Sequence, residues 1–159
     1  HFEKLRRLEF FLEFEDIELW EVLRICVWHD LASKVALIRE GETNRLFGII
    51  INGFVEVSIE GRSLCRLGAG EVVGEMTYLH PSDSKRHATV TTLEPTLFLE
   101  VNSSALELGS DELLERFNKA LTAKVLARLR AANKALIQSA PPAVQGSSGS
   151  KIDLELLPE

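Results

Sequence analysis

The spacing of hydrophobic residues changes along the chain and predicts three kinds of structure in turn. Between Phe2 and Val27, apolar residues recur every three or four positions with acidic residues between them. This period predicts amphipathic N-terminal helices, which we place over residues 1–28. Glu15 and Asp16 separate two such helices, and Asp16 is the expected N-cap of the second.

Between residues 35 and 101, apolar and polar residues alternate in short blocks. Each block predicts a strand, and glycine or proline separates the blocks, as expected for tight turns. The predicted strands cover residues 35–39, 46–51, 54–59, 63–67, 71–73, 89–93 and 96–101. Short strands of this kind predict a small antiparallel β-roll, a jelly-roll-like barrel.

From residue 110 the helical period returns and continues to residue 139. Ser110 is the expected N-cap of this long C-terminal helix, and Pro141 lies just beyond its end. The pattern therefore predicts one α+β domain over residues 1–139. Residues 140–159 contain a Gly/Ser-rich linker and are expected to be the start of an output domain or an artificial remnant.

Composition and charge narrow the classes of function. The chain has 159 residues, of which 45% are apolar, which is enough for one compact domain with a core. Eighteen basic and 24 acidic residues give a net charge of −6. This charge disfavours nonspecific electrostatic binding to nucleic acid or to an anionic membrane. No apolar run is long enough to cross a bilayer. The chain begins with His1 rather than methionine, so we expect a fragment or a processed protein.

The residues that usually hold metals or attack substrates do not form recognisable motifs. Cys26 and Cys65 lie far apart in apolar surroundings, which is typical of reduced core thiols and of a cytoplasmic protein. The four histidines show none of the spacings of metal ligands, and no nucleophile motif is present outside the linker. We therefore expect neither a metal nor an enzymatic activity. A metal-dependent jelly-roll enzyme stays an alternative that metal analysis would test.

Residues 70–90, GEVVGEMTYLHPSDSKRHATV, carry the strongest candidate site. A turn at Gly74 leads into one helical turn that starts at Glu75, and Arg86 follows after a polar loop. Free amide groups at the start of a short helix attract an anion, and an arginine beside them pairs with the same anion. A carboxylate repels a phosphate but accepts a hydrogen bond from a sugar hydroxyl. Glu75 next to an anion site therefore predicts a ligand with both groups, which is a nucleotide.

Two motifs stand in this segment in a fixed order. They are Gly74-Glu75-Met76-Thr77 and Arg86-His87-Ala88-Thr89-Val90. The two motifs lie in a predicted β-roll with glycine at its turns, and a long helix follows the roll. In this context they resemble the phosphate-binding cassette of the cyclic nucleotide-binding domain family. That family includes the catabolite activator protein, the regulatory subunits of protein kinase A and cyclic-nucleotide-gated channels. The resemblance extends over roughly residues 10–137.

The resemblance implies a role for each cassette residue. Glu75 would receive the ribose 2′-hydroxyl, and Arg86 would neutralise the cyclic phosphate. The residues whose backbone amides would complete the cradle are Gly74, Met76, Thr77 and His87. Ala88 follows as the small residue of the second motif. The implied ligand is cyclic AMP, with cyclic GMP as an alternative, because family members with a hydroxyl at the position of His87 use it to choose between the two.

The C-terminal helix offers further candidates. Asn133 is a candidate to hydrogen-bond a purine edge, although a mid-helix asparagine is more often a solvated or interface residue. Arg128, Arg130 and Lys134 are expected to form a solvated face. An apolar stripe on the same helix would allow a homodimer. The ordinary alternative for Glu75 with Arg86 is a surface ion pair worth about 1 kcal/mol or less.

These observations lead to one leading hypothesis and one rival of another class. The leading hypothesis is a regulatory, allosteric module that senses a cyclic nucleotide and signals through the C-terminal helix to an output domain or partner protein outside the chain. The rival is a degenerate domain that keeps the fold as a protein interaction or dimerisation scaffold without binding nucleotide.

Overall fold

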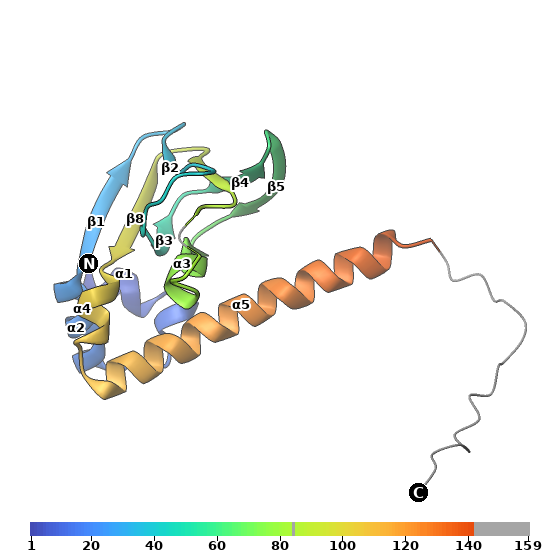
Figure 1. Cartoon of the computed structure of the whole chain (residues 1–159). Helices are drawn as coiled ribbons and strands as arrows, with labels where there is room; N and C mark the ends of the chain where they lie inside the picture. The colour runs from blue at the N-terminus through green and yellow to red at the C-terminus, as the bar shows by residue number, and fades with distance from the viewer. Residues whose placement is uncertain (84, 142–159) are drawn as a thin grey trace, which may run out of the picture.

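The structure, a computed structural model, describes residues 1–83 and 85–141. Within these residues, eight strands form two antiparallel sheets of four strands each. Helices precede the roll, and a long helix follows it, as predicted (Figure 1). The two sheets pack together but do not close into a barrel, so the fold is an antiparallel β-roll rather than a barrel. The predicted linker lies almost entirely outside the described residues.

Most neighbouring strands in each sheet come from distant parts of the chain. The first, in spatial order, contains β1 (Cys26–Leu31), β8 (Thr96–Val101), β3 (Gly48–Asn52) and β6 (Val72–Val73). The second contains β2 (Ala36–Ile38), β7 (Thr89–Thr92), β4 (Val55–Ile59) and β5 (Arg62–Leu67). The helical elements are α1 (Phe2–Arg6), η1 (Glu9–Phe11), α2 (Asp16–Ile25), α3 (Glu75–Leu79), α4 (Ser103–Glu107) and α5 (Asp111–Ser139).

The second N-terminal helix, α2, differs from its prediction at both ends. The helical prediction for residues 26–28 is wrong, because α2 ends at Ile25 and these residues begin β1, which pairs with β8 along its whole length. Cross-strand pairing with β8 decides the conformation there, although the local apolar spacing also fits a helix. Asp16 is the first helical residue instead of the N-cap. The N-cap is Glu15, which forms a reciprocal capping box with Glu18.

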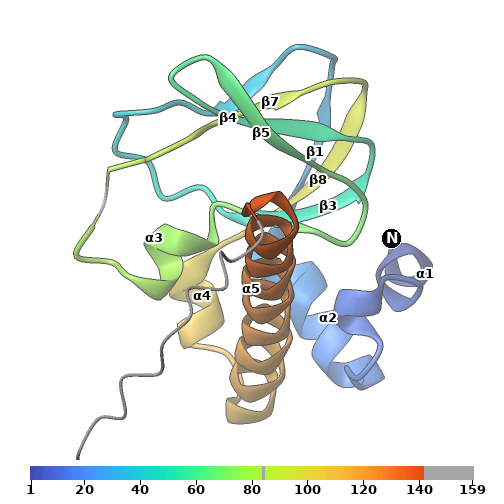
Figure 2. The same cartoon turned by 90° about the vertical axis from the view of Figure 1, so that its right-hand side faces the viewer.

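The long helix α5 is the structural link between the N-terminal helices and the β-roll. Ser110 caps it as predicted, since its hydroxyl accepts from the amide of Leu113 at 3.2 Å. Only the first part of α5 is buried, through three apolar residues: Leu113, Phe117 and Leu121. These side chains pack with the N-terminal helices and the first sheet in the main core. The rest of α5 passes beside α3 and extends beyond the roll (Figures 1 and 2).

Ion pairs add to the apolar contacts that attach α5. Lys119 lies 3.4 Å from Glu13, and Lys124 lies 3.5 Å from Glu9 and 3.6 Å from Glu71. The basic side of α5 therefore faces acidic residues of the N-terminal segment and of the roll.

The two cysteines lie in different environments. Both are free thiols; Cys26 is buried at the start of β1, whereas Cys65 is exposed. The prediction that both are core thiols is wrong for Cys65, because it lies on β5, an edge strand of the second sheet. Among the residues that the structure describes, none of the helices combines the length and the apolar character that a membrane span requires.

Candidate functional site

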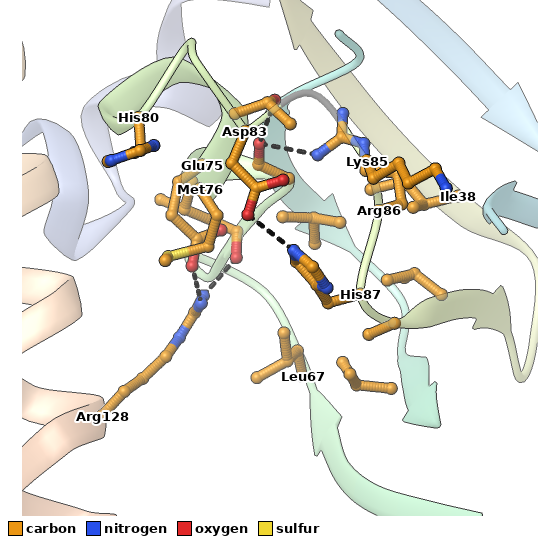
Figure 3. A pocket seen from close by; sticks show the side chains of 17 residues that line it. Ile38, Leu67, Glu75, Met76, His80, Asp83, Lys85, Arg86, His87 and Arg128 are labelled. Atoms are coloured by element: carbon orange, nitrogen blue, oxygen red, sulfur yellow. Dashed lines mark hydrogen bonds and ion pairs between the residues drawn. The ribbon is translucent and has the colours of Figure 1, made fainter. Parts of the chain in front are cut away.

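A cavity of about 420 Å³ opens between the second sheet, α3 and the middle of α5 (Figure 3). Its apolar wall comes from strands of the roll, and its polar wall comes from the segment between β6 and β7 and from Arg128 of α5. The apolar wall residues include Ile38, Val57, Leu67 and Val90. The polar side includes Gly74, Glu75, Met76, Thr77, Arg86, His87 and Ala88. The structure thus brings together every predicted site residue except Asn133.

Gly74 makes the turn that gives the cavity its floor. Its φ of 80° lies in the left-handed region, and an added Cβ would overlap the carbonyl oxygen of Leu46 and lie 3.1 Å from the Cα of Phe47. Only glycine combines this conformation with so close an approach. The turn leads directly into α3, whose first residues line the cavity, and the hydroxyl of Thr77 donates back to the Gly74 carbonyl at 3.1 Å.

Arg86 is a buried cation that only neutral groups hold. The residue is 6% exposed. Its Nε donates to Oδ1 of Asn44 at 3.1 Å, its Nη1 donates to the carbonyl of Gly74 at 3.0 Å, and its Nη2 donates to the carbonyl of Leu46. Within residues 1–83 and 85–141, no carboxylate lies within ion-pair distance of it. Burial lowers the pKa of Arg86, and the negative charge of Glu75 opposes that shift.

This arrangement has the electrostatics that suit the binding of an anion. A buried charge is costly unless an opposite charge compensates for it. Three neutral acceptors hold the Arg86 guanidinium in place but leave its charge uncompensated, so a bound anion would be stabilised there. The sequence offers no signal for Asn44, which reaches the arginine from the loop between β2 and β3.

Glu75 is also buried, and its partner is Arg128 rather than Arg86. It is 8% exposed, and its Oε1 accepts from Nη1 of Arg128 at 2.5 Å. No ion pair joins Glu75 to Arg86 among the described residues, and neither lies on the surface. The interpretation of these two residues as a surface ion pair is therefore wrong.

The prediction of a solvated face is wrong for Arg128, which lines the cavity. It does not belong to a solvated face, because its guanidinium also donates to the carbonyl of Val72 and lies 3.4 Å from Oε2 of Glu71. The sequence does contain a signal for its burial, because Arg128 lies on the same face of the helix as Phe117 and Leu121, which face the core. Arg130 and Lys134 are exposed, as expected. Asn133 is exposed on α5 and does not line the cavity.

His87 and Asp83 form a pair at the cavity rim (Figure 3). Nε2 of His87 lies 2.7 Å from Oδ2 of Asp83, and both side chains are exposed. This hydrogen bond is the main cause that lowers the pKa of Asp83. His87 is thus turned toward Asp83 at the edge of the cavity. Within the described residues, no group of three metal-ligating side chains is close enough to hold an ion.

The fold and the site define a β-roll whose cavity combines a buried cation, a glycine turn and a buried carboxylate. Comparison with known sequences identifies its class. The family described as "Cyclic nucleotide-binding domain" matches residues 29–108. The chain belongs to the cyclic nucleotide-binding domain family.

Individual relatives agree with this assignment. The chain is 33% identical over 82 residues to the Pycsar effector protein PaPycTIR of Pseudomonas aeruginosa, a match that spans 52% of this chain and 26% of that protein. A cyclic nucleotide-binding domain from Methylobacillus flagellatus KT has a TM-score of 0.76 at 20% identity, covering 90% of this chain and 86% of that one.

A structure of the regulatory domain of Toxoplasma gondii PKA with cAMP has a TM-score of 0.56 at 24% identity. It covers 67% of this chain and 42% of that one. At these identities, the structural matches show a common fold. The chain thus shares the β-roll with proteins that carry further segments outside it.

Proposed function

We propose that the chain is a regulatory module that binds a cyclic nucleotide in this cavity, prefers cyclic AMP to cyclic GMP, and passes on the occupancy through α5. The observation that carries the proposal is the buried guanidinium of Arg86 among neutral acceptors only. A cyclic phosphate supplies the missing negative charge, and the membership of the family makes a cyclic nucleotide the ligand class.

The cavity can accommodate the three parts of such a ligand. The phosphate binds Arg86 and the amide groups after Gly74, and the ribose 2′-hydroxyl donates to Glu75. The base then lies toward the apolar wall that includes Val57 and Leu67. The volume of about 420 Å³ lies within the range of about 300–1,000 Å³ that is usual for small-molecule sites.

The preference for cyclic AMP rests on the rim of the cavity and on one structural relative. His87 has no hydroxyl, and its ring faces Asp83, so the rim offers no serine or threonine at the position that the family uses for discrimination. The Toxoplasma gondii regulatory domain, which shares this fold, contains cAMP. Asn133 is exposed here and would contact a base only after α5 moves toward the roll.

The output of the module lies outside the chain in this proposal. The match to PaPycTIR spans 26% of that protein, so this β-roll corresponds to one part of a larger relative. The exposed side chains Leu129 and Leu136 on the free part of α5 provide a surface for an output segment or a second copy. We assign the chain a binding role and no catalytic role. The exposed free thiol of Cys65 suits a reducing, cytoplasmic location.

The test is calorimetric titration of cyclic AMP and cyclic GMP into the parent chain and into Arg86→Ala. Truncating Arg86 should weaken binding by about thirtyfold to several thousandfold, corresponding to roughly 2 to 5 kcal/mol. Arg130→Ala is the matched control, because Arg130 is exposed and lies outside the cavity, and its affinity should equal that of the parent. Absence of binding by the parent to both nucleotides contradicts the proposal and favours the interaction scaffold.

A further inference from the structure

We propose that Asp83 recognises the base of the bound nucleotide: it accepts a hydrogen bond from an exocyclic amino group and so selects adenine against bases with an oxo group at that position. The inference deepens the proposed function and rests on it. The feature that carries it is the carboxylate of Asp83, which lines the rim of the cavity and points toward His87 (Figure 3). Asp83 belongs to neither cassette motif, because it lies in the loop between them.

The apolar wall of the cavity cannot distinguish one base from another by hydrogen bonds. In the proposed binding mode the phosphate lies at Arg86 and the ribose at Glu75, so the base lies along this wall. The side chains of the wall are those of Ile38, Val57, Leu67, Val72, Val73 and Val90. None of them has a group that donates or accepts a hydrogen bond. The polar edge of the base must therefore be recognised by side chains beyond the wall.

The polar side chains at the rim come from the loop that follows α3. They are exposed, and they belong to His80, Asp83, Lys85 and His87. Lys85 can only donate, Nδ1 of His80 already lies 3.0 Å from the hydroxyl of Ser82, and Nε2 of His87 already faces Asp83. Among the described residues that line the cavity, only Glu75 and Asp83 are carboxylates. With Glu75 at the ribose, Asp83 is the strong acceptor that lies within reach of the base.

Asp83 is prepared for this role by its contact with His87. Nε2 of His87 lies 2.7 Å from Oδ2 of Asp83, and this hydrogen bond is the main cause that lowers the pKa of Asp83. Asp83 is therefore ionised near neutral pH and can only accept. A carboxylate has about four acceptor positions, of which His87 takes one. A base can thus donate to Asp83 while the pair with His87 stays intact.

The chemistry of the bases makes a single carboxylate selective. Adenine has an amino group at position 6, which donates, whereas guanine and hypoxanthine have an oxo group there, which accepts. An amino group gains a hydrogen bond to the charged carboxylate. An oxo group faces a second acceptor, which repels it and takes the place of a water donor. Asp83 therefore favours cyclic AMP by attraction and disfavours the oxo bases by repulsion.

The experiment measures by calorimetry the affinities of three cyclic nucleotides that differ at position 6 of the purine. Cyclic AMP has an amino group there, the cyclic monophosphate of purine riboside has a hydrogen, and cyclic IMP has an oxo group. The affinity of the parent should fall in this order. Cyclic AMP should bind about tenfold more tightly than cyclic IMP, because the side chain of Asp83 is 51% exposed and water weakens its hydrogen bonds.

Two substitutions of Asp83 and one matched control test the assignment. In Asp83→Ala and in Asp83→Asn, the affinities for cyclic AMP and cyclic IMP should lie within about threefold of each other. The reason is that alanine has no acceptor, while the amide of asparagine donates as readily as it accepts. Asp30→Ala is the control, because Asp30 is an exposed aspartate on β1 outside the cavity, and it should keep the ratio of the parent.

The ratio of the affinities separates recognition of the base from other roles of Asp83. A loss in Asp83→Ala that is equal for all three nucleotides shows that Asp83 only holds the loop, and it overturns the inference. A parent that binds cyclic IMP as tightly as cyclic AMP also overturns it, while the proposed function stands as long as Arg86→Ala fails to bind. A parent that binds none of the three nucleotides overturns the proposed function as well.

Discussion

The guanidinium of Arg86 donates a hydrogen bond of 3.0 Å to the carbonyl oxygen of Gly74, although 12 residues separate the two in the sequence. Gly74 connects β6 to α3, so this bond joins the arginine to the turn that begins α3. The two cassette motifs are therefore directly linked, and substitutions at Gly74 and Arg86 should not be additive.

Replacing Gly74 with alanine should damage both the fold and the cavity. The added Cβ would overlap the carbonyl of Leu46, in addition to the strain of a φ of 80°. That strain alone costs about 1–2 kcal/mol, and the overlap would shift the turn away from Arg86. We expect a lower melting temperature and loss of nucleotide binding, measured by calorimetry and thermal unfolding.

Gly70→Ala is the matched control for this substitution. Gly70 has a similar φ of 85°, but nothing lies within 4 Å of its added Cβ. It should show the strain cost with little change in nucleotide affinity. Equal loss of affinity in both variants would contradict the specific role of the turn at Gly74.

Removing Glu18 should destabilise the N-terminal helices more than removing a neighbouring acidic residue. Glu18 is 3% exposed, and its Oε2 accepts from the amide of Glu15 at 2.9 Å while Oε1 lies 3.5 Å from Arg116 of α5. Glu18→Ala should lower the free energy of unfolding by about 2 kcal/mol, because the amide of Glu15 loses its acceptor and Arg116 loses the nearer of its two carboxylate partners. Urea titration measures this change.

Glu13→Ala provides the comparison for Glu18→Ala. Glu13 forms an exposed pair with Lys119 at 3.4 Å. Exposed pairs contribute between about 0 and 1 kcal/mol, so this variant should unfold at nearly the same urea concentration as the parent. Equal effects of the two substitutions would show that burial of Glu18 has no consequence for stability.

The two thiols should differ strongly in reactivity. Burial, with a smaller contribution from the charge of Glu100, raises the pKa of Cys26 to about 12, while Cys65 is exposed. A thiol reagent at pH 8 should modify Cys65 quickly and Cys26 only after unfolding, because the thiolate is the reactive form. Peptide mapping after timed alkylation measures both rates, and fast modification of Cys26 in the folded protein would contradict its burial.

Cys26 also sets the direction of a pH effect on stability. Its pKa is higher in the folded state than in the unfolded chain, so the folded protein keeps the proton where the unfolded chain loses it. Stability should therefore fall as the pH rises from about 9 toward 12, and Cys26→Ala should flatten this part of the profile. Urea unfolding between these pH values gives the slope.

The hydrogen bond at the cavity rim should be visible in the titration of Asp83. The hydrogen bond from His87 lowers the pKa of Asp83 in the folded protein. A carboxyl with a depressed folded pKa contributes stability above its unfolded pKa and loses it as the pH falls through the folded value. Carboxyl titration by NMR should show Asp83 below its usual range, and His87→Ala should return it toward that range. An unchanged titration in the variant would show that the pair does not form in solution.

Much of the roll and the cassette was predictable because their signals are local. Glycine between short alternating blocks marks turns, and the two motifs of the cassette lie within 20 residues of each other. β1 was not predicted, because the interaction that makes it a strand is not local. Its residues continue the apolar spacing of α2, and only pairing with β8, some 70 residues later, makes them a strand.

The site residues that the sequence did not reveal come from distant segments. Asn44 and Arg128 meet Arg86 and Glu75 across 42 and 53 residues. Neither belongs to a motif, and a single asparagine in a polar loop or an arginine on a helix has many ordinary explanations. The one usable clue was that Arg128 continues the buried face of its helix, where a charged side chain needs a partner.

The anchoring of α5 at one end gives the helix the mechanics of a lever. Its buried contacts end at Leu121, and the 18 residues from there to Ser139 extend about 27 Å at the usual rise per residue. A tilt of about 10° at this pivot would move the far end by about 5 Å. Arg128, which contacts Glu75, lies about 10 Å from the same pivot and would move by about 2 Å, so a shift beside the cavity would be accompanied by a displacement more than twice as large at the free end of the helix.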